Sequence, residues 1–119
     1  MIIGVVGPCG AGKSSLVAGL KSHGYMSRHI AQEHSYVPDM WRRLTNPDFL
    51  IYLDVSYENT LLRRKLDWTY KEFLEQIHRL RHARQYADLY LDTNSLTLKE
   101  VLQFVESFIE SQCKPSRLK

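Results

Sequence analysis

The feature that most constrains this chain is a glycine-rich segment close to its first residue. Residues 7–14 read Gly-Pro-Cys-Gly-Ala-Gly-Lys-Ser and satisfy the pattern G-x-x-x-x-G-K-[ST] in full. An apolar run, 2–6, precedes the segment, and apolar residues at helical spacing follow it. The glycines let the backbone direct several N–H groups at one anion, and the following helix adds its own free N–H groups. The segment therefore predicts a loop that binds the phosphates of a nucleoside triphosphate.

Individual positions in this phosphate loop have expected roles. Lys13 would reach the β- and γ-phosphates, and the Ser14 hydroxyl would ligate Mg²⁺. We expect ATP and Mg²⁺ to bind through consecutive residues, which are Gly7, Pro8, Cys9, Gly10, Ala11, Gly12, Lys13, Ser14 and Ser15. The alternative is a glycine-rich turn with an exposed lysine. The apolar strand before the segment and the amphipathic helix after it favour the phosphate loop.

Size and charge narrow the class of protein. The 119 residues fit one domain, which we place at residues 1–113, with a disordered tail at 114–119. The net charge of +3 suits a polyanionic ligand such as a nucleotide. Because 13 acidic residues nearly balance 16 basic ones, nucleic acid is not an expected partner. A homodimer is left open.

Cysteine usage and hydropathy bear on the compartment. Cys9 and Cys113 lie at opposite ends of the chain, and a disulfide at Cys9 would hold the phosphate loop away from its ligand. We expect both to be reduced thiols. The first residues lack the basic start and the length of a signal peptide, and no run approaches the ~20 apolar residues that span a bilayer. These observations predict a cytoplasmic protein that does not associate with a membrane.

Hydrophobic periodicity predicts that strands and helices alternate along the chain. The four expected strands cover residues 2–6, 25–31, 49–55 and 88–92. The expected helices cover residues 13–23, 38–44, 56–66, 69–86 and a last segment from residue 97. Ser56 is expected to cap the helix at 56–66. Capping boxes are expected at Thr69 with Glu72 and at Thr97 with Glu100, at the starts of the last two helices.

This alternation predicts an α/β fold, a three-layer α/β/α sandwich with a four-stranded parallel sheet. The strand at 2–6 is expected to have a neighbour on each side. The strand at 88–92 is expected near one edge of the sheet.

Three segments of the chain carry a resemblance to known enzymes. They are Gly-Pro-Cys-Gly-Ala-Gly-Lys-Ser-Ser-Leu at 7–16, residues 49–56 followed by Leu61-Leu62-Arg63-Arg64, and residues 87–93 followed by 96–100. These resemble the phosphate loop, the late strand with its lid-approach helix, and the last strand and helix of the small P-loop kinases. That group of P-loop NTPases includes nucleoside monophosphate, shikimate and gluconate kinases. The resemblance implies a P-loop NTPase-like fold and Mg-ATP-dependent transfer of the γ-phosphoryl group to a small-molecule or nucleotide acceptor.

The chain departs from this family between residues 25 and 48. These enzymes usually have a further strand ending in Asp-Gly or a similar acidic pair, and a separate acceptor-binding domain. The stretch here is too short to contain both. A nucleotide-binding switch or regulatory module with little catalysis is therefore the alternative function.

Phosphoryl transfer would require a carboxylate near the metal, and Glu33 is the leading candidate. It follows the second expected strand, at the carboxyl edge where ligands bind in open α/β sheets. The resemblance gives an acidic residue at this place the task of orienting Mg²⁺ or activating the acceptor. The alternative is a surface glutamate in a loop. Asp39, which can charge a first helical turn, and Asp54, inside the strand at 49–55, are weaker candidates.

Two basic clusters on the expected helices, 63–65 and 78–84, contain the remaining candidates. A solvated helix face is the ordinary explanation for such a cluster. The resemblance implies a lid instead, with Arg63 and Arg79 as catalytic candidates that stack on the adenine or clamp the transferring phosphoryl group. It also implies that the 92–96 loop packs against the base. Two locations are left open for the tryptophans, Trp41 and Trp68: each side chain belongs either to the hydrophobic core or to a ligand pocket.

Overall fold

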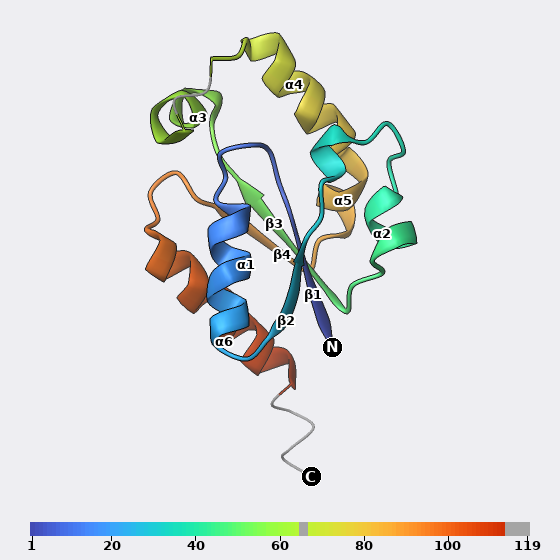
Figure 1. Ribbon diagram of the computed structural model, residues 1–119, viewed down its shortest axis with the longest axis vertical. Coiled ribbons are helices and arrows are strands. Elements are labelled where there is room, and N and C mark those ends of the chain that lie inside the picture. Colours follow the sequence, from blue (N-terminus) through green and yellow to red (C-terminus); the bar gives the residue numbers. More distant parts are fainter. Residues whose placement is uncertain (65–66, 114–119) are drawn as a thin grey trace.

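The fold is built on one four-stranded parallel sheet. The structure, a computed structural model, describes residues 1–64 and 67–113. The strands are β1 (Ile2–Val6), β2 (Met26–His29), β3 (Phe49–Asp54) and β4 (Leu89–Asp92). Their order is β2-β1-β3-β4, and each neighbouring pair is parallel (Figure 1). The predictions of a parallel sheet, of a β1 flanked on both sides and of an edge position for the last strand are confirmed.

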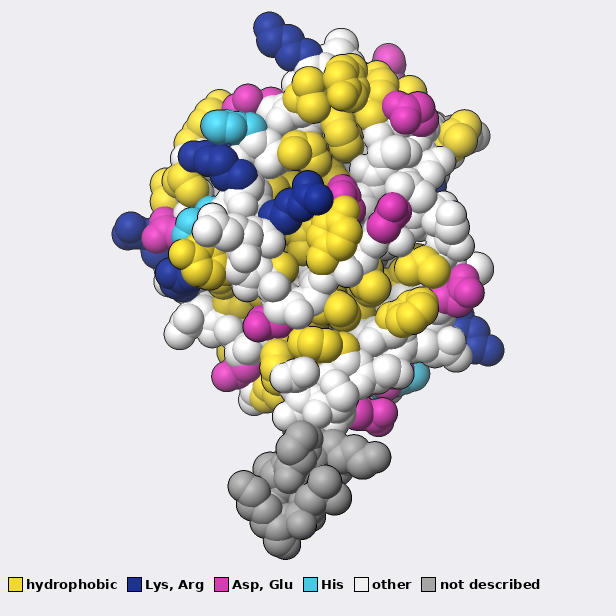
Figure 2. Space-filling view, turned by 180° about the vertical axis from the view of Figure 1, so that it is seen from behind, with side chains coloured by type: hydrophobic (Ala, Val, Ile, Leu, Met, Phe, Trp, Pro, Cys, Tyr) yellow, Lys and Arg dark blue, Asp and Glu magenta, His cyan; other side chains and the backbone are white. Residues whose placement is uncertain are grey.

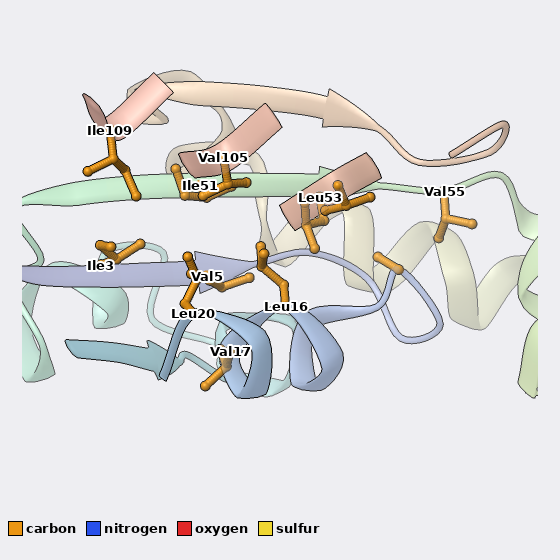
Figure 3. Close-up of a cluster of buried hydrophobic side chains, with 12 residues drawn as sticks. Ile3, Val5, Leu16, Val17, Leu20, Ile51, Leu53, Val55, Val105 and Ile109 are labelled. Carbon is orange, nitrogen blue, oxygen red and sulfur yellow. The ribbon is translucent and has the colours of Figure 1, made fainter. Parts of the chain in front are cut away.

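Helices cover both faces of the sheet because alternate residues of each strand point to opposite sides. On one face Ile3 and Val5 of β1 and Ile51 and Leu53 of β3 pack against α1 (Lys13–Ser22) and α6 (Leu98–Cys113) (Figure 3). On the other face Val6, Leu50 and Tyr52 pack against side chains of α2 (Met40–Leu44) and α5 (Arg81–Tyr86). Two separate hydrophobic clusters therefore hold the sheet between helical layers.

The remaining elements lie at the carboxyl ends of the strands. They are the single 3₁₀ turn η1 (Gln32–His34), α3 (Tyr57–Arg64) and α4 (Tyr70–Arg79). In Figure 1 the blue loop after β1 arches at this end of the sheet, and α3 and α4 lie beyond it.

The predicted capping residues start their helices as expected. Ser56 accepts a hydrogen bond from the Asn59 N–H before α3. Thr69 and Glu72 form a reciprocal capping box before α4. Thr97 and Glu100 exchange the same pair of hydrogen bonds at the start of α6. The predicted end of α3 near Leu66 and the predicted disordered tail at 114–119 lie outside the described residues.

Two predicted helices are wrong in extent. The segment 69–86 is two helices, because the backbone tightens at Leu80, whose N–H is shared between the carbonyls of Gln76 and Ile77. Leu80 is fully buried in the second cluster, so core packing overrides the continuous helical pattern there. The helix predicted at 38–44 begins only at Met40, because Met40 closes a turn onto Val37 that contains Pro38. Within the described ranges, no helix is long and apolar enough to cross a membrane.

Candidate functional site

The glycine-rich loop connects β1 to α1 at the carboxyl edge of the sheet, as predicted. Gly7 has a φ of 154°, and a Cβ added there would lie 2.1 Å from the Leu53 carbonyl oxygen of the neighbouring strand. Only glycine fits that approach. Gly12 precedes α1 in the left-handed conformation, with a φ of 96°. The loop thus needs glycine at both positions: at Gly7 because the neighbouring strand comes too close for a Cβ, and at Gly12 because of the left-handed backbone conformation.

Lys13 lies inside the loop rather than in solvent. Its side chain is 6% exposed, and its ammonium donates hydrogen bonds to the carbonyls of Gly7 (2.7 Å) and Pro8 (2.9 Å). The same ammonium lies 3.0 Å from Glu33 Oε2. An ordinary glycine-rich turn with an exposed lysine does not describe this arrangement.

Glu33 is buried beside the loop, not exposed at the surface. Its side chain is 2% exposed, and Oε2 lies 3.9 Å from His29 Nε2 and 3.8 Å from His34 Nε2. Its second oxygen, Oε1, is buried and has no hydrogen-bond partner among the described residues. The surface-glutamate alternative is therefore wrong, and the carboxylate lies at the same edge of the sheet as Ser14.

The short segment that carries Glu33 is fixed by its neighbour Gln32. The Gln32 amide donates to the carbonyls of Val37 (2.8 Å) and Arg79 (3.3 Å) and accepts from the Trp41 N–H (2.9 Å). Gln32 is fully buried. Because the amide joins three segments, it holds η1 against α2 and α4 and so sets the position of Glu33.

The charges around Glu33 affect His29. Burial, and next the positive charge of Lys13, lower the pKa of His29 below its ordinary value, and the negative charge of Glu33 only partly offsets this. His29 is therefore neutral near neutral pH, and one nitrogen of its ring can accept a hydrogen bond.

A polar cavity of about 230 Å³ opens in front of Lys13 and Glu33. It is lined by residues of the loop and of the segment after β2, which are Cys9, Gly10, Gly12, Lys13, Ser14, His29, Glu33 and His34. Ammonium, hydroxyl, imidazole and carboxylate groups thus meet in one concavity.

A larger cavity of about 510 Å³ lies on the other side of the loop. Its walls come from the loop, from Arg63 and from the start of α6: Gly10, Ala11, Gly12, Ser14, Ser15, Arg63, Thr93, Leu96, Thr97, Leu98 and Val101. Gly10, Gly12 and Ser14 line both cavities. The loop therefore separates a polar compartment from a larger one with leucine and valine in its walls.

Arg63 forms one wall of the larger cavity. Its guanidinium donates to the Thr93 hydroxyl (2.9 Å), to the Thr93 carbonyl and to the Gly10 carbonyl (3.5 Å). Thr93 is fixed in turn to β3, because its hydroxyl donates to the Asp54 carbonyl at 2.8 Å. Arg63 thus connects the glycine-rich loop with the loop that follows β4.

Arg79, the other predicted arginine, occupies a different place. Its guanidinium lies over the Tyr36 ring at 4.3 Å and pairs with Glu75 at 3.3 Å. It also donates to the Glu33 carbonyl at 3.4 Å. Arg79 therefore supports the backbone of η1 and is not among the residues that line either cavity.

Asp54 and Asp39 each have other partners. The Asp54 carboxylate accepts hydrogen bonds from the Val55 N–H (2.9 Å) and from the Tyr90 hydroxyl of the edge strand. Burial and this hydrogen bond raise the pKa of Tyr90 to about 12. Asp39 pairs with Arg43 at 2.9 Å, and that hydrogen bond is the main reason why the pKa of Asp39 is lowered. Neither carboxylate lines the polar cavity.

Both tryptophans lie away from the two cavities. Trp41 is 5% exposed within the second hydrophobic cluster. Trp68 donates to the Thr60 hydroxyl at 2.9 Å and packs edge-on against Phe73. The core interpretation therefore holds for Trp41, and Trp68 belongs to an aromatic contact between α3 and α4.

Sequence reasoning missed three residues around the glycine-rich loop. His29 and His34 were not singled out, although both flank Glu33 within five residues and that spacing is a usable signal. Gln76 gave no local signal. Its amide oxygen accepts the Cys9 N–H at 3.0 Å, and its nitrogen donates to Cys9 Sγ at 3.2 Å.

No protein-family model matches this chain, and no curated protein sequence matches it.

Proposed function

We propose that this chain has a P-loop NTPase-like fold, binds Mg-ATP, and transfers the γ-phosphoryl group to a small-molecule or nucleotide acceptor. The observation that carries the proposal is the buried ammonium of Lys13, enclosed by its own loop and paired with Glu33 at 3.0 Å. A lysine held at this position can exchange loop carbonyls for phosphate oxygens without leaving the cavity. The N–H groups at the start of α1 and the helix dipole favour the same anion.

The larger cavity suits the base and ribose of a nucleotide. Its volume of about 510 Å³ lies within the range of ordinary ligand sites. The planar guanidinium of Arg63 offers a stacking surface for a purine, and Leu96, Leu98 and Val101 supply apolar contacts. The triphosphate would then run over Gly12 and Ser14 into the polar cavity, since these residues line both compartments.

The donor set beside Lys13 fits Mg²⁺. This ion prefers oxygen ligands and keeps several of its waters. Ser14 offers a hydroxyl to the polar cavity, and Glu33 offers a buried oxygen that has no partner among the described residues. When bound, Mg²⁺ would neutralise charge on the phosphate oxygens. Glu33 would hold the water shell of the ion or accept a proton from the acceptor, and Lys13 would stabilise the charge of the transferring group.

A nucleotide-binding module with little catalysis is the second candidate. The Lys13–Glu33 ion pair favours it, because the Lys13 ammonium already occupies Oε2 of the carboxylate that would serve as the base. The segment after β2 contributes only η1 and α2 before β3 begins, so within residues 1–64 and 67–113 no separate acceptor domain is present. Figure 2 bears on a third possibility, nucleic-acid binding: on this face Lys and Arg are interspersed with Asp and Glu rather than gathered into one basic surface.

A two-stage assay tests the proposal. Calorimetric titration with Mg-ATP measures binding first. A panel of nucleosides, nucleotides, sugars and oligonucleotide ends is then screened for acceptor-dependent ATP consumption. Binding with turnover on one acceptor supports the kinase, whereas binding without turnover on any of them supports the module. Absence of ATP binding in the folded protein rejects both.

A further inference from the structure

Three side chains of metal-ligating type meet at the edge of the polar cavity. Cys9 Sγ lies 3.8 Å from His34 Nε2, and His34 Nε2 lies 3.8 Å from Glu33 Oε2. The potential ligand atoms of all three residues lie within 4.8 Å of one another. Cys9 comes from the phosphate loop, and the other two are consecutive residues of η1. The cluster is therefore formed by the parallel pairing of β1 with β2, which brings the segments after both strands together.

These separations are close to those of a bound zinc ion. With Zn–S near 2.3 Å and Zn–N and Zn–O near 2.0–2.1 Å, ligand atoms of a tetrahedral site lie roughly 3.3–3.6 Å apart. The two 3.8 Å separations need a contraction of roughly 0.3–0.5 Å on that geometry, and the third needs one of up to about 1.3 Å. The side chain of His34 is 60% exposed, so its ring can rotate to shorten the two 3.8 Å separations.

An independent observation also indicates a missing ligand. Glu33 Oε1 is buried without a hydrogen-bond partner among the described residues, and the whole side chain is 2% exposed. Burying a carboxylate oxygen without a partner is costly, and a bound ion is one of the ordinary explanations. Lys13 pairs with Oε2, which is also the oxygen that lies 3.8 Å from His34 Nε2, so a metal held through Oε1 would leave the Lys13–Glu33 ion pair in place.

The positions of the three side chains are set by buried amides. The Gln76 side chain is 8% exposed and makes two hydrogen bonds with Cys9. Its amide oxygen accepts from the Cys9 backbone N–H, and its amide nitrogen donates to the Cys9 sulfur. The hydrogen bond donated to the sulfur fixes the direction in which the Cys9 side chain points. Gln32 fixes η1 in the way described above. Cys9 and the backbone of η1 are thus held in place before a metal arrives, and the exposed His34 ring is left to adjust.

We propose that Cys9, Glu33 and His34 form a binding site for a soft or borderline divalent metal, with Zn²⁺ as the best fit. One sulfur, one imidazole nitrogen and one carboxylate oxygen select Zn²⁺ or Co²⁺ over Mg²⁺, which prefers oxygen ligands only. Three protein ligands leave the fourth tetrahedral position for water or for a phosphate oxygen. On binding, the Cys9 thiol releases its proton to solvent as the metal–sulfur bond forms. The inference is independent of the proposed ATP chemistry, although both would use Glu33.

Metal binding is measured on the purified, reduced full-length chain without nucleotide. Zn²⁺ affinity is determined by competition with a chromophoric chelator, and Co²⁺ is added separately to record the thiolate-to-cobalt charge-transfer absorption. Cys9→Ser and His34→Gln should each weaken Zn²⁺ binding by at least about tenfold. Cys9→Ser should also abolish the charge-transfer absorption.

Matched controls exclude binding elsewhere. Cys113→Ser removes the other of the two cysteines, and His78→Gln removes an exposed histidine of α4; neither should change the affinity. Circular dichroism confirms that each variant is folded. Equal Zn²⁺ affinity in the wild type, Cys9→Ser and His34→Gln would overturn the proposal, as would loss of the cobalt absorption in Cys113→Ser. Because no nucleotide is present, a failure of the ATP proposal leaves this result unaffected.

Discussion

The ammonium of Lys13 and the carboxylate of Glu33 lie 3.0 Å apart, and the two side chains are only 6% and 2% exposed. The pair joins the start of α1 to the turn after β2, and the register that pairs Val5 with His29 brings these segments together. A buried ion pair of this kind is weak evidence for stability, because desolvation offsets much of the attraction. The pair lies in the lining of the polar cavity, where the proposed function gives both charges a ligand to bind.

Glu33→Gln separates binding from catalysis. The variant keeps the shape of the side chain but removes its charge, so ATP binding should remain nearly intact. If Glu33 orients Mg²⁺ or acts as a base, turnover should fall by about a hundredfold or more. The measurement is ATP consumption with the acceptor found in the panel, with Glu75→Gln, whose side chain is 51% exposed, as the matched control. Full activity in Glu33→Gln would reject this role.

Arg63→Ala tests the base compartment. Loss of a stacking contact worth about 1 kcal/mol or more should weaken ATP binding by about five- to tenfold. Binding of inorganic triphosphate, which has no base to stack, should change much less. Arg81→Ala is the control, because Arg81 is exposed and its guanidinium donates to the His78 carbonyl at 2.7 Å, within its own helical region. Equal losses for ATP and triphosphate would place Arg63 at the phosphates instead.

Gly7→Ala tests the packing of the loop against the sheet. The new Cβ would lie 2.1 Å from the Leu53 carbonyl oxygen, so the free energy of unfolding should fall by about 3 kcal/mol or more. Gly24→Ala is a suitable comparison, because Gly24 also has a positive φ but no atom within 4 Å of an added Cβ. That change should cost only about 1–2 kcal/mol. Urea unfolding of the three proteins gives both values, and equal losses would contradict the close approach at Gly7.

The fall in the free energy of unfolding at alkaline pH is expected to depend on Tyr90. Its pKa in the folded protein is about 12, above the ordinary value of 10.0, because the hydroxyl is partly buried and bonded to Asp54. As the pH rises, the unfolded chain therefore loses the Tyr90 proton at a lower pH than the folded protein does. The contribution of Tyr90 to the free energy of unfolding is then lost between about pH 10 and 12. Tyr90→Phe should lower stability near pH 7 but flatten this alkaline decline. Urea midpoints measured from pH 7 to 11 check the slope, and parallel curves would contradict the assignment.

The sequence was sufficient for the features that depend on local patterns. Residues 7–14 lie between an apolar run and an amphipathic segment, and the structure places them as the loop between β1 and α1. Thr69 and Thr97 start their helices through hydrogen bonds with partners three residues away. Parallel pairing followed from the alternation of strands and helices. These predictions needed no information about contacts between distant residues.

Contacts between distant segments could not be predicted in the same way. Gln76 lies 67 residues from Cys9, and Arg63 lies 30 residues from Thr93, so no local pattern links the members of either pair. Arg79 was chosen for its place in a basic cluster, yet its contacts with Tyr36 and Glu75 are decided by how α4 packs on η1. The break at Leu80 has the same origin, because burial in the core overrides the helical pattern.

Lys13→Ala, titrated with Mg-ATP by calorimetry beside the wild type, tests the central claim most directly. The change removes a charge-assisted contact worth on the order of 1.5–3 kcal/mol, so ATP affinity should fall by at least about tenfold. Lys21→Ala, an exposed lysine of the same helix, should bind like the wild type. Circular dichroism establishes that Lys13→Ala is folded, since it leaves Glu33 buried without its partner. Unchanged ATP affinity in folded Lys13→Ala, or no ATP binding by the wild type, would contradict the assignment of residues 7–14 as a nucleotide phosphate site.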